Sequence, residues 1–429
     1  MSDDFDFDER RESRRARSGR PAEYLGTARI NGLTVQRWKS VAGIIAIAWN
    51  TYDGPPTPDG ELAEELRNLG VGATLRAMPH FGVGGPALHP VSIPGVADPP
   101  EVTWDELAEA LGQPLPYWPT PLQQRKLIDA WQPGRATVQA LAVDPEMDLD
   151  VLLRLAALYD RDHPAAQVLM RLFRTVTWRE SQAAAQMISN VESMTPGSAV
   201  VIGARPIPVP RPHSDDLAET VRRAGWLEIL GRADLLADAC VEQLVRWDGG
   251  RDCPFGTSVE LLPGDPISDE VIARLEPAAR TAAFRFLDAP LDAETLVDPA
   301  TDAPAVRVTN KDGLRVRIAV SQWLPAMAPL AELVLDDPIW VRTADGVVYP
   351  APQDPRWGIS WGYSGNGPGA LALLLHRLLD DVTSRAADDA NGAPEGLERL
   401  FKVSLPKGTV LTRAQLEAAR DDGWLPQAP

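Results

Sequence analysis

Apolar and polar residues near the start of the chain follow the spacing of strands. Over residues 33–37, Leu33, Val35 and Arg37 alternate with the polar residues Thr34 and Gln36, as in a strand. The apolar run Gly43–Trp49 is typical of a buried strand. The pattern then predicts a helix near Glu61–Leu69 and a further strand over Val71–Ala77. The order strand, strand, helix, strand indicates a mixed α/β unit over residues 23–100.

Helical periodicity dominates residues 101–205. Thr103-Trp-Asp-Glu106 has the spacing of a capping box, which predicts a helix that starts there and runs to Leu111. Further helices are expected over Leu122–Trp131, Asp148–Tyr159, Pro164–Val176 and Trp178–Val191.

Proline-rich segments indicate two domain boundaries. The run Arg205–Pro212 is interpreted as a linker, followed by a mostly helical region over residues 206–300. A second polar, proline-containing stretch at Asp298–Pro304 precedes residues 301–429, where Asp312-Gly313 predicts the turn of a hairpin. The expected class is α+β, with a mixed N-terminal unit, a helical middle and a C-terminal module of β-hairpin and glycine-turn-helix.

The most informative stretch of that module begins at Trp357. Ile359, Trp361 and Tyr363 alternate with small or polar residues, which predicts a strand. Pro368 suits the first turn of a helix. The turn between them is rich in glycine, and the helix that follows carries an apolar face; these residues are Gly362, Gly365, Gly367 and Gly369, then Leu371, Leu374, Leu375, Leu378 and Leu379.

Such a turn before a helix can bind a phosphate or carboxylate through unpaired backbone N–H groups. The candidate ligand-binding residues are Tyr363, Ser364, Gly365, Asn366, Gly367 and Gly369. The alternative is that the glycines only permit close packing, with Ser364 or Asn366 capping the helix. We prefer this alternative, because most glycine turns before helices bind nothing.

Enzyme motifs fit the turn poorly. It has no lysine for a phosphate-binding P-loop, and Asn366 stands where a nucleophile elbow needs its second glycine. The dinucleotide fingerprint is matched formally by Gly365-x-Gly367-x-x-Ala370 with Asp388 and Asp389 further on. These acidic residues follow a polar stretch and not a second strand, so the match is weak.

The run WGYSGNGPGALALLL, with its flanking segments Val341–Val348 and Leu400–Thr412, resembles a small domain family of unknown function found in bacteria and their phages. The family shares a W-G-Y-x-G-x-G-P-x-x-L-A core, a following F-K-x-x-x-x-x-L-P segment and an acidic C-terminal helix. The resemblance covers about residues 335–422. In this chain the gap between Phe401-Lys402 and Leu405-Pro406 is shorter than in the family pattern, and Ser384–Gly396 resembles a longer insertion. The resemblance implies a fold unit and a bacterial or phage context but no chemistry.

The formal charge of -18 makes nucleic acid and anionic membranes poor partners. The segment Met1–Ala22 is expected to be a disordered charged tail, and only its arginine-rich part, Arg10–Arg20, offers a contact for nucleic acid or an acidic partner. Only five of the 42 basic residues are lysines, and with abundant alanine and proline this composition is like that of an actinobacterium.

Two cysteines, Cys240 and Cys253, are too few for a disulfide framework. No apolar segment resembles a signal peptide or a membrane span, so a cytoplasmic location is expected. His80 and His89 lie in a glycine-rich stretch that is expected to be a loop, and with a carboxylate such as Asp53 they could bind a metal or transfer protons. No ligand spacing supports this, so no metal or catalytic residue is assigned.

The leading hypothesis is a non-enzymatic binding or assembly protein, an accessory protein whose partners are other proteins or copies of itself. The first alternative is a sensor of a nucleotide or phosphometabolite through Gly365–Gly369. The second is an enzyme that uses His80 or His89. None of these hypotheses calls for a cofactor.

Overall fold

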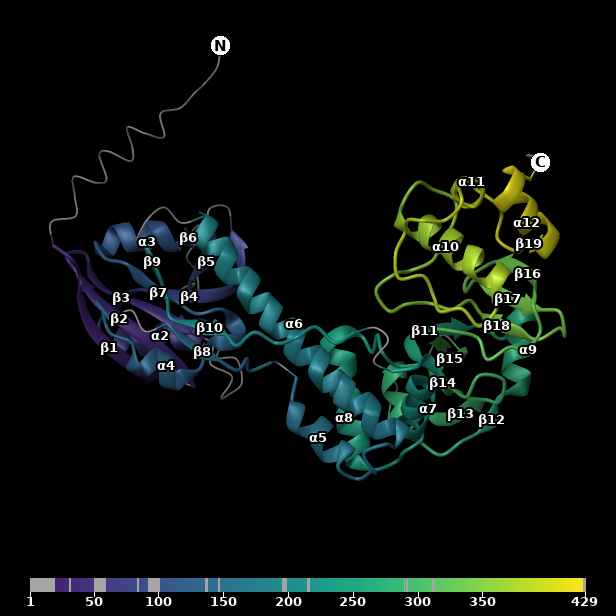
Figure 1. Ribbon diagram of the computed structural model, residues 1–429, viewed down its shortest axis with the longest axis horizontal. Coiled ribbons are helices and arrows are strands. Elements are labelled where there is room, and N and C mark those ends of the chain that lie inside the picture. Colours follow the sequence, from purple (N-terminus) through teal and green to yellow (C-terminus); the bar gives the residue numbers. More distant parts are fainter. Residues whose placement is uncertain are drawn as a thin grey trace, which may run out of the picture. The chain divides into compact units, whose positions relative to one another are not determined.

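The computed structural model describes residues 20–30, 32–49, 59–82, 85–91, 101–135, 138–145, 147–194, 199–213, 217–288, 290, 292–310 and 313–426. The expected tail, with Arg10–Arg20, therefore lies outside the described residues except for its last three positions. The chain divides into two compact units (Figure 1). Unit 1 comprises residues 1–146 and 174–213, and unit 2 comprises residues 147–173 and 214–429. Helices combine with several sheets to give the α+β class that the sequence predicts.

A six-stranded sheet forms the centre of unit 1. Its strands follow chain order, and they are β1 (Glu23–Ile30), β2 (Leu33–Ser40), β3 (Gly43–Trp49), β4 (Val71–Gly82), β5 (Gly85–Pro90) and β6 (Val102–Thr103). Only β3 and β4 are parallel, and helix α2 (Asp59–Asn68) connects them. The predicted order strand, strand, helix, strand is confirmed, with β1 added at the edge.

Both faces of this sheet are covered. Ala46 and Ala48 of β3 point to the side of α2, where they cluster with Leu62 and Leu66. The alternate residues of the strand, among them Trp49, join a second core with α3 (Trp104–Leu111), α4 (Arg125–Ala130) and the C-terminal part of α6 (Pro164–Met194). Period-two alternation in β3 thus builds two cores.

The segment expected to be helical, residues 101–205, is mixed. The capping box of α3 is confirmed, since Thr103 and Glu106 bond each other's backbone N–H. Four short strands form two parallel pairs, β7 (Leu115–Tyr117) with β9 (Val200–Ile202) and β8 (Gln139–Leu141) with β10 (Ala204–Pro206). The two helices expected over 164–191 are one helix, α6, because neither glycine nor proline interrupts the sequence between them.

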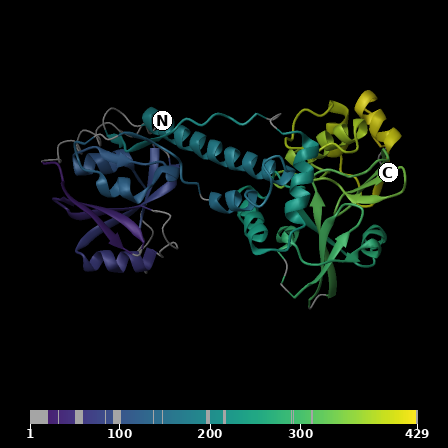
Figure 2. The ribbon, with the colours of Figure 1, turned by 60° about the horizontal axis from the view of Figure 1, so that its bottom comes forward.

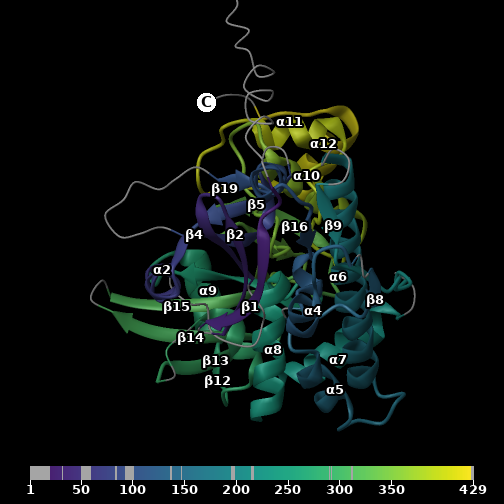
Figure 3. The same cartoon turned by 90° about the vertical axis from the view of Figure 1, so that its left-hand side faces the viewer.

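Unit 2 contains an antiparallel five-stranded sheet in the order β11-β15-β14-β13-β12. Its strands are among the green arrows of Figure 2, and Figure 3 labels β12, β13, β14 and β15. The strands are β11 (Phe255–Leu261), β12 (Glu276–Pro277), β13 (Glu294–Asp298), β14 (Ala303–Asn310) and β15 (Gly313–Ser321). The hairpin predicted around residue 313 is β14 and β15. It pairs with strands from residues 255–298, so this sheet crosses the boundary expected near residue 300.

Four α-helices and one 3-10 helix accompany this sheet. The region 206–300, expected to be mostly helical, therefore also contains the strands β11, β12 and β13. The helices are α5 (Leu149–Ala156), α7 (Glu219–Leu230), α8 (Leu235–Asp248), α9 (Pro266–Arg274) and the 3-10 helix η3 (Ala282–Leu287). Before η3 the chain runs beside β13, where the Ala278 N–H donates to the Thr295 carbonyl at 3.0 Å.

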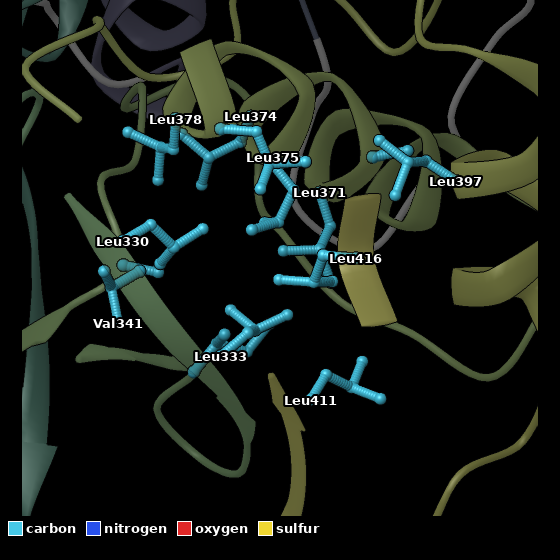
Figure 4. Packing of buried hydrophobic residues seen from close by; sticks show 14 of the residues in the cluster. Leu330, Leu333, Val341, Leu371, Leu374, Leu375, Leu378, Leu397, Leu411 and Leu416 are labelled. Atoms are coloured by element: carbon cyan, nitrogen blue, oxygen red, sulfur yellow. The ribbon is translucent and has the colours of Figure 1, made fainter. Parts of the chain in front are cut away.

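A second sheet of unit 2 has the order β18-β17-β16-β19. Its strands are β16 (Leu330–Leu335), β17 (Trp340–Thr343), β18 (Val348–Pro350) and β19 (Thr409–Thr412), and the helices packed with it are α10 (Asn366–Asp380), α11 (Glu395–Lys402) and α12 (Arg413–Asp422). Figure 4 shows sheet residues such as Leu330 and Leu333 gathered with the leucines of α10. The predicted apolar face of α10 is confirmed.

Two polar clusters join the parts of unit 2. Asp298, at the end of β13, is fully buried and accepts two hydrogen bonds from Arg274 of α9, at 2.8 and 2.7 Å. The third nitrogen of Arg274 donates to the carbonyl of Val348 in β18 at 2.7 Å. One arginine therefore ties the five-stranded sheet to the four-stranded sheet.

The second cluster surrounds the buried side chain of Gln322, which directly follows β15. Its amide N–H group donates to the carbonyls of Arg251 and Cys253, at 3.0 and 2.8 Å. Its oxygen accepts from Nε and Nη2 of Arg385, at 3.1 and 2.6 Å. Burial lowers the pKa of Arg385, and repulsion by Arg222 lowers it further.

We expect Asp298→Ala to lower the free energy of unfolding by about 3–5 kcal/mol, because it leaves the Arg274 guanidinium without its carboxylate. Glu294→Ala is the matched control: its partner Arg307 lies at 2.8 Å on the same sheet, but Glu294 is exposed and Arg307 is only half-buried. The control should lower the free energy of unfolding by at most about 1 kcal/mol. Denaturant titration of both variants measures the difference, and equal small losses would contradict the role given to the pair.

Candidate functional site

The segment before α10 is not the strand that alternation predicts. Residues 358–361 are irregular, and residues 362–365 form bends. The Gly362 N–H donates to the carbonyl of Phe401 at 2.8 Å, and the Trp361 indole donates to that of Leu405 at 2.8 Å. The strand prediction is wrong because Ile359 and Trp361 are side chains packed on the α10 core, and no described strand pairs with this backbone.

The glycines of the turn serve close packing. A Cβ on Gly367 would lie 2.0 Å from the Ser360 hydroxyl oxygen, and one on Gly369 would lie 2.1 Å from the carbonyl oxygen of Ala390. Gly365 is the N-cap of α10, and no side chain caps the helix. The expectation that Ser364 or Asn366 caps it is therefore wrong.

The predicted ligand-binding residues fall into two groups. Tyr363, Ser364, Gly365 and Asn366 are exposed, whereas Gly367 and Gly369 are buried. The space before Gly367 is taken by the hydroxyls of Ser360 and Tyr363, which lie 3.0 Å apart. Anion binding at the turn remains a prediction, and only the exposed group would meet a ligand without displacing these hydroxyls.

The dinucleotide fingerprint lacks its structural context. A dinucleotide fold places the glycine turn between parallel strands. The four-stranded sheet beside α10 is antiparallel, and the segment after α10 leads to α11 without a strand. Asp388 bonds Arg377 at 3.0 Å, and Asp389 accepts from the N–H groups of Ala390 and Asn391.

The two histidines of the enzyme hypothesis lie in strands and not in the expected loop. His80 belongs to β4, and His89 belongs to β5, where it is opposite Arg76. Asp53 and the side chain of His80 lie outside the described residues. Where the structure describes side chains, no three His, Cys, Asp or Glu residues come together to hold a metal ion. The catalytic hypothesis thus stays untested.

A surface that the sequence analysis missed lies around η3 in unit 2. It consists of two hollows that share Thr281 and Phe284, and we call it the η3 surface. The first hollow, of about 450 Å³, is also lined by Ala233, Leu235, Asp238, Arg280, Ala282, Arg285 and Asp288. The second, of about 400 Å³, is also lined by Leu227, Leu230, Gly231, Phe255, Ala278, Ala279, Ala283, Val297, Asp302 and Pro304.

Large apolar side chains stand at both hollows. Leu235, at the first turn of α8, is 87% exposed, and Leu227 of α7 is 41% exposed. Phe284, Phe255 and Leu230 are buried beneath them. One feature of the sequence could have indicated this surface: Leu235 directly follows Asp234, which caps α8, so a leucine occupies the first position of the helix. The other lining residues come from distant segments that only the tertiary fold brings together.

Comparison with known proteins gives no relative: no family model, no curated protein and no solved structure matches the chain. Within the described ranges, no helix is long and apolar enough to span a membrane.

The packing role of Gly369 predicts that Gly369→Ala lowers the free energy of unfolding by about 1–3 kcal/mol, because the new methyl group would overlap the carbonyl of Ala390. Gly358→Ala is the control, since a Cβ there meets nothing within 4 Å. It should be neutral or stabilising by up to about 1 kcal/mol. Equal stabilities of the two variants would show that a methyl group fits at residue 369 and would contradict the prediction.

Both cysteines should be unreactive in the folded protein. Cys240 and Cys253 are fully buried, and burial raises the pKa of Cys240 to about 12 and that of Cys253 well above its usual value. Because the thiolate is the reactive form, iodoacetamide at pH 8 should modify neither cysteine in the native protein and both after unfolding. Mass spectrometry measures the modification, and rapid native labelling would contradict the burial.

Proposed function

We propose that this protein is a non-enzymatic binding protein, an accessory protein that acts by holding a protein partner. The observation that carries the proposal is the η3 surface, where exposed Leu227 and Leu235 stand beside two adjoining hollows. Exposed apolar side chains grouped over concave surface are typical of sites that bind other proteins.

Other features support the same class of function. Two polar contacts of unit 2, Arg274 with Asp298 and Arg385 with Gln322, are partly buried and join structural elements. The resemblance of residues 335–422 to a bacterial and phage domain family would fit an accessory role in the cytoplasm. Self-association through the same surface is the variant of this proposal in which the partner is a second copy.

A random peptide library displayed on phage tests the proposal without knowledge of the partner. We expect selection on the wild-type protein to enrich peptides that lose binding to Leu227→Ser/Leu235→Ser, because that variant removes the exposed apolar contacts. Leu314→Ser is the control, since Leu314 of β15 is 44% exposed and lines neither hollow. Failure to enrich peptides, or enrichment that the double variant leaves intact, would refute binding at the η3 surface.

A further inference from the structure

We infer that the η3 surface takes a peptide segment of another protein in which basic side chains flank an apolar one. This inference rests on the proposed function and adds the chemistry of the partner. Three features of the surface carry it: the apolar floor, the state of its arginines and the state of its aspartates.

The apolar part of the peptide is required by the floor of the hollows. Phe284 is shared by both hollows and is only 4% exposed, so its ring closes the bottom of the surface. Leu227 and Leu235 stand exposed beside it. A side chain that enters either hollow is removed from water against these groups, and this transfer is favourable for apolar atoms.

The arginines of the surface are already engaged within unit 2. Arg285 forms a two-nitrogen contact with the carboxylate of Asp238, and its guanidinium also lies 3.7 Å from Glu242. Arg280 lies over the ring of Phe284, 5.9 Å from its centroid, and donates to the carbonyl of Pro290 at 3.0 Å. An acidic ligand would have to compete with these contacts.

Two other aspartates at the hollows have no such partner. Asp288 lines the first hollow and Asp302 the second; both are exposed, and neither side chain forms an ion pair or hydrogen bond with the described residues. Their carboxylates are thus available on either side of the apolar floor. In a protein of net charge -18, the long-range field also favours a cationic partner.

Both aspartates have positive φ, 42° for Asp288 and 57° for Asp302. Asparagine adopts this conformation as readily as aspartate does, so Asp→Asn removes the charge and keeps the backbone. The variants Asp288→Asn and Asp302→Asn therefore isolate the electrostatic contribution. Asp160→Asn is the matched control, because Asp160 is exposed in unit 2 and lines neither hollow.

Fluorescence anisotropy with three labelled peptides tests the inference. The basic probe is GRLARLLRAG, the acidic probe GELAELLEAG carries glutamate at each arginine, and GRSARSSRAG lacks the leucines. We expect the basic probe alone to bind, each Asp→Asn variant to weaken binding roughly threefold and the double variant roughly tenfold, with Asp160→Asn unchanged. Added salt should also weaken binding, because exposed charges are screened.

The outcomes separate this inference from the proposed function. Equal or tighter binding of the acidic probe, or no binding of the basic probe, overturns the inference. If library selection still enriches peptides that need Leu227 and Leu235, the proposed function stands with a partner of different charge. Self-association that is lost in Leu227→Ser/Leu235→Ser would assign the surface to a second copy and would likewise overturn the inference.

Discussion

The buried amide of Gln322 holds together three segments of unit 2 that are far apart in the sequence. It donates to the loop after α8, accepts from Arg385, and its own backbone carbonyl accepts from the Ala386 N–H at 2.6 Å. A buried polar group without a partner costs as much as a lost hydrogen bond or more. Loss of this one side chain would remove the amide donor to the Cys253 carbonyl and the acceptor for Arg385, whose guanidinium would keep its contact with the carbonyl of Arg251. The three segments therefore depend on one another.

This constraint reaches the η3 surface through the backbone. The Gln322 N–H donates to the carbonyl of Pro254 at 2.7 Å, and the next residue, Phe255, begins β11 and lines the second hollow. Arg274 and Asp298 fix the other side, since β13 supplies Val297 to the same hollow. The elements around the exposed leucines are thus tied by the hydrogen bonds of Gln322 and of Arg274 with Asp298. A surface that is already ordered loses less conformational freedom when it binds a partner.

Local signals in the sequence predicted local structure well. The capping box at Thr103, the apolar run of β3, the leucine face of α10 and the hairpin before Ser321 all depend on residues close in the chain. The strand expected before α10 failed because Trp361 and Gly362 bond residues some forty positions away, and alternation alone does not reveal a missing partner strand.

The candidate site was predictable only in part, for the same reason. The glycine turn was located from sequence, but the atoms that fill it come from Ser360 and from Ala390, beyond the far end of α10. The η3 surface joins α7, α8, β13 and β14, and no spacing rule connects Leu227 to Asp302. Sequence reasoning could not tell which helical leucine would remain exposed.

The order of strands in unit 2 has a consequence for synthesis on the ribosome. β11 ends at Leu261, but β15, its neighbour in the sheet that the structure describes, begins at Gly313. At about 5–20 residues per second, β11 is exposed for about 3–10 seconds before that neighbour has been made. Arg385, which completes the cluster around Gln322, is translated later still. The newly made chain therefore contains the β11 segment without its pairing strand during that interval.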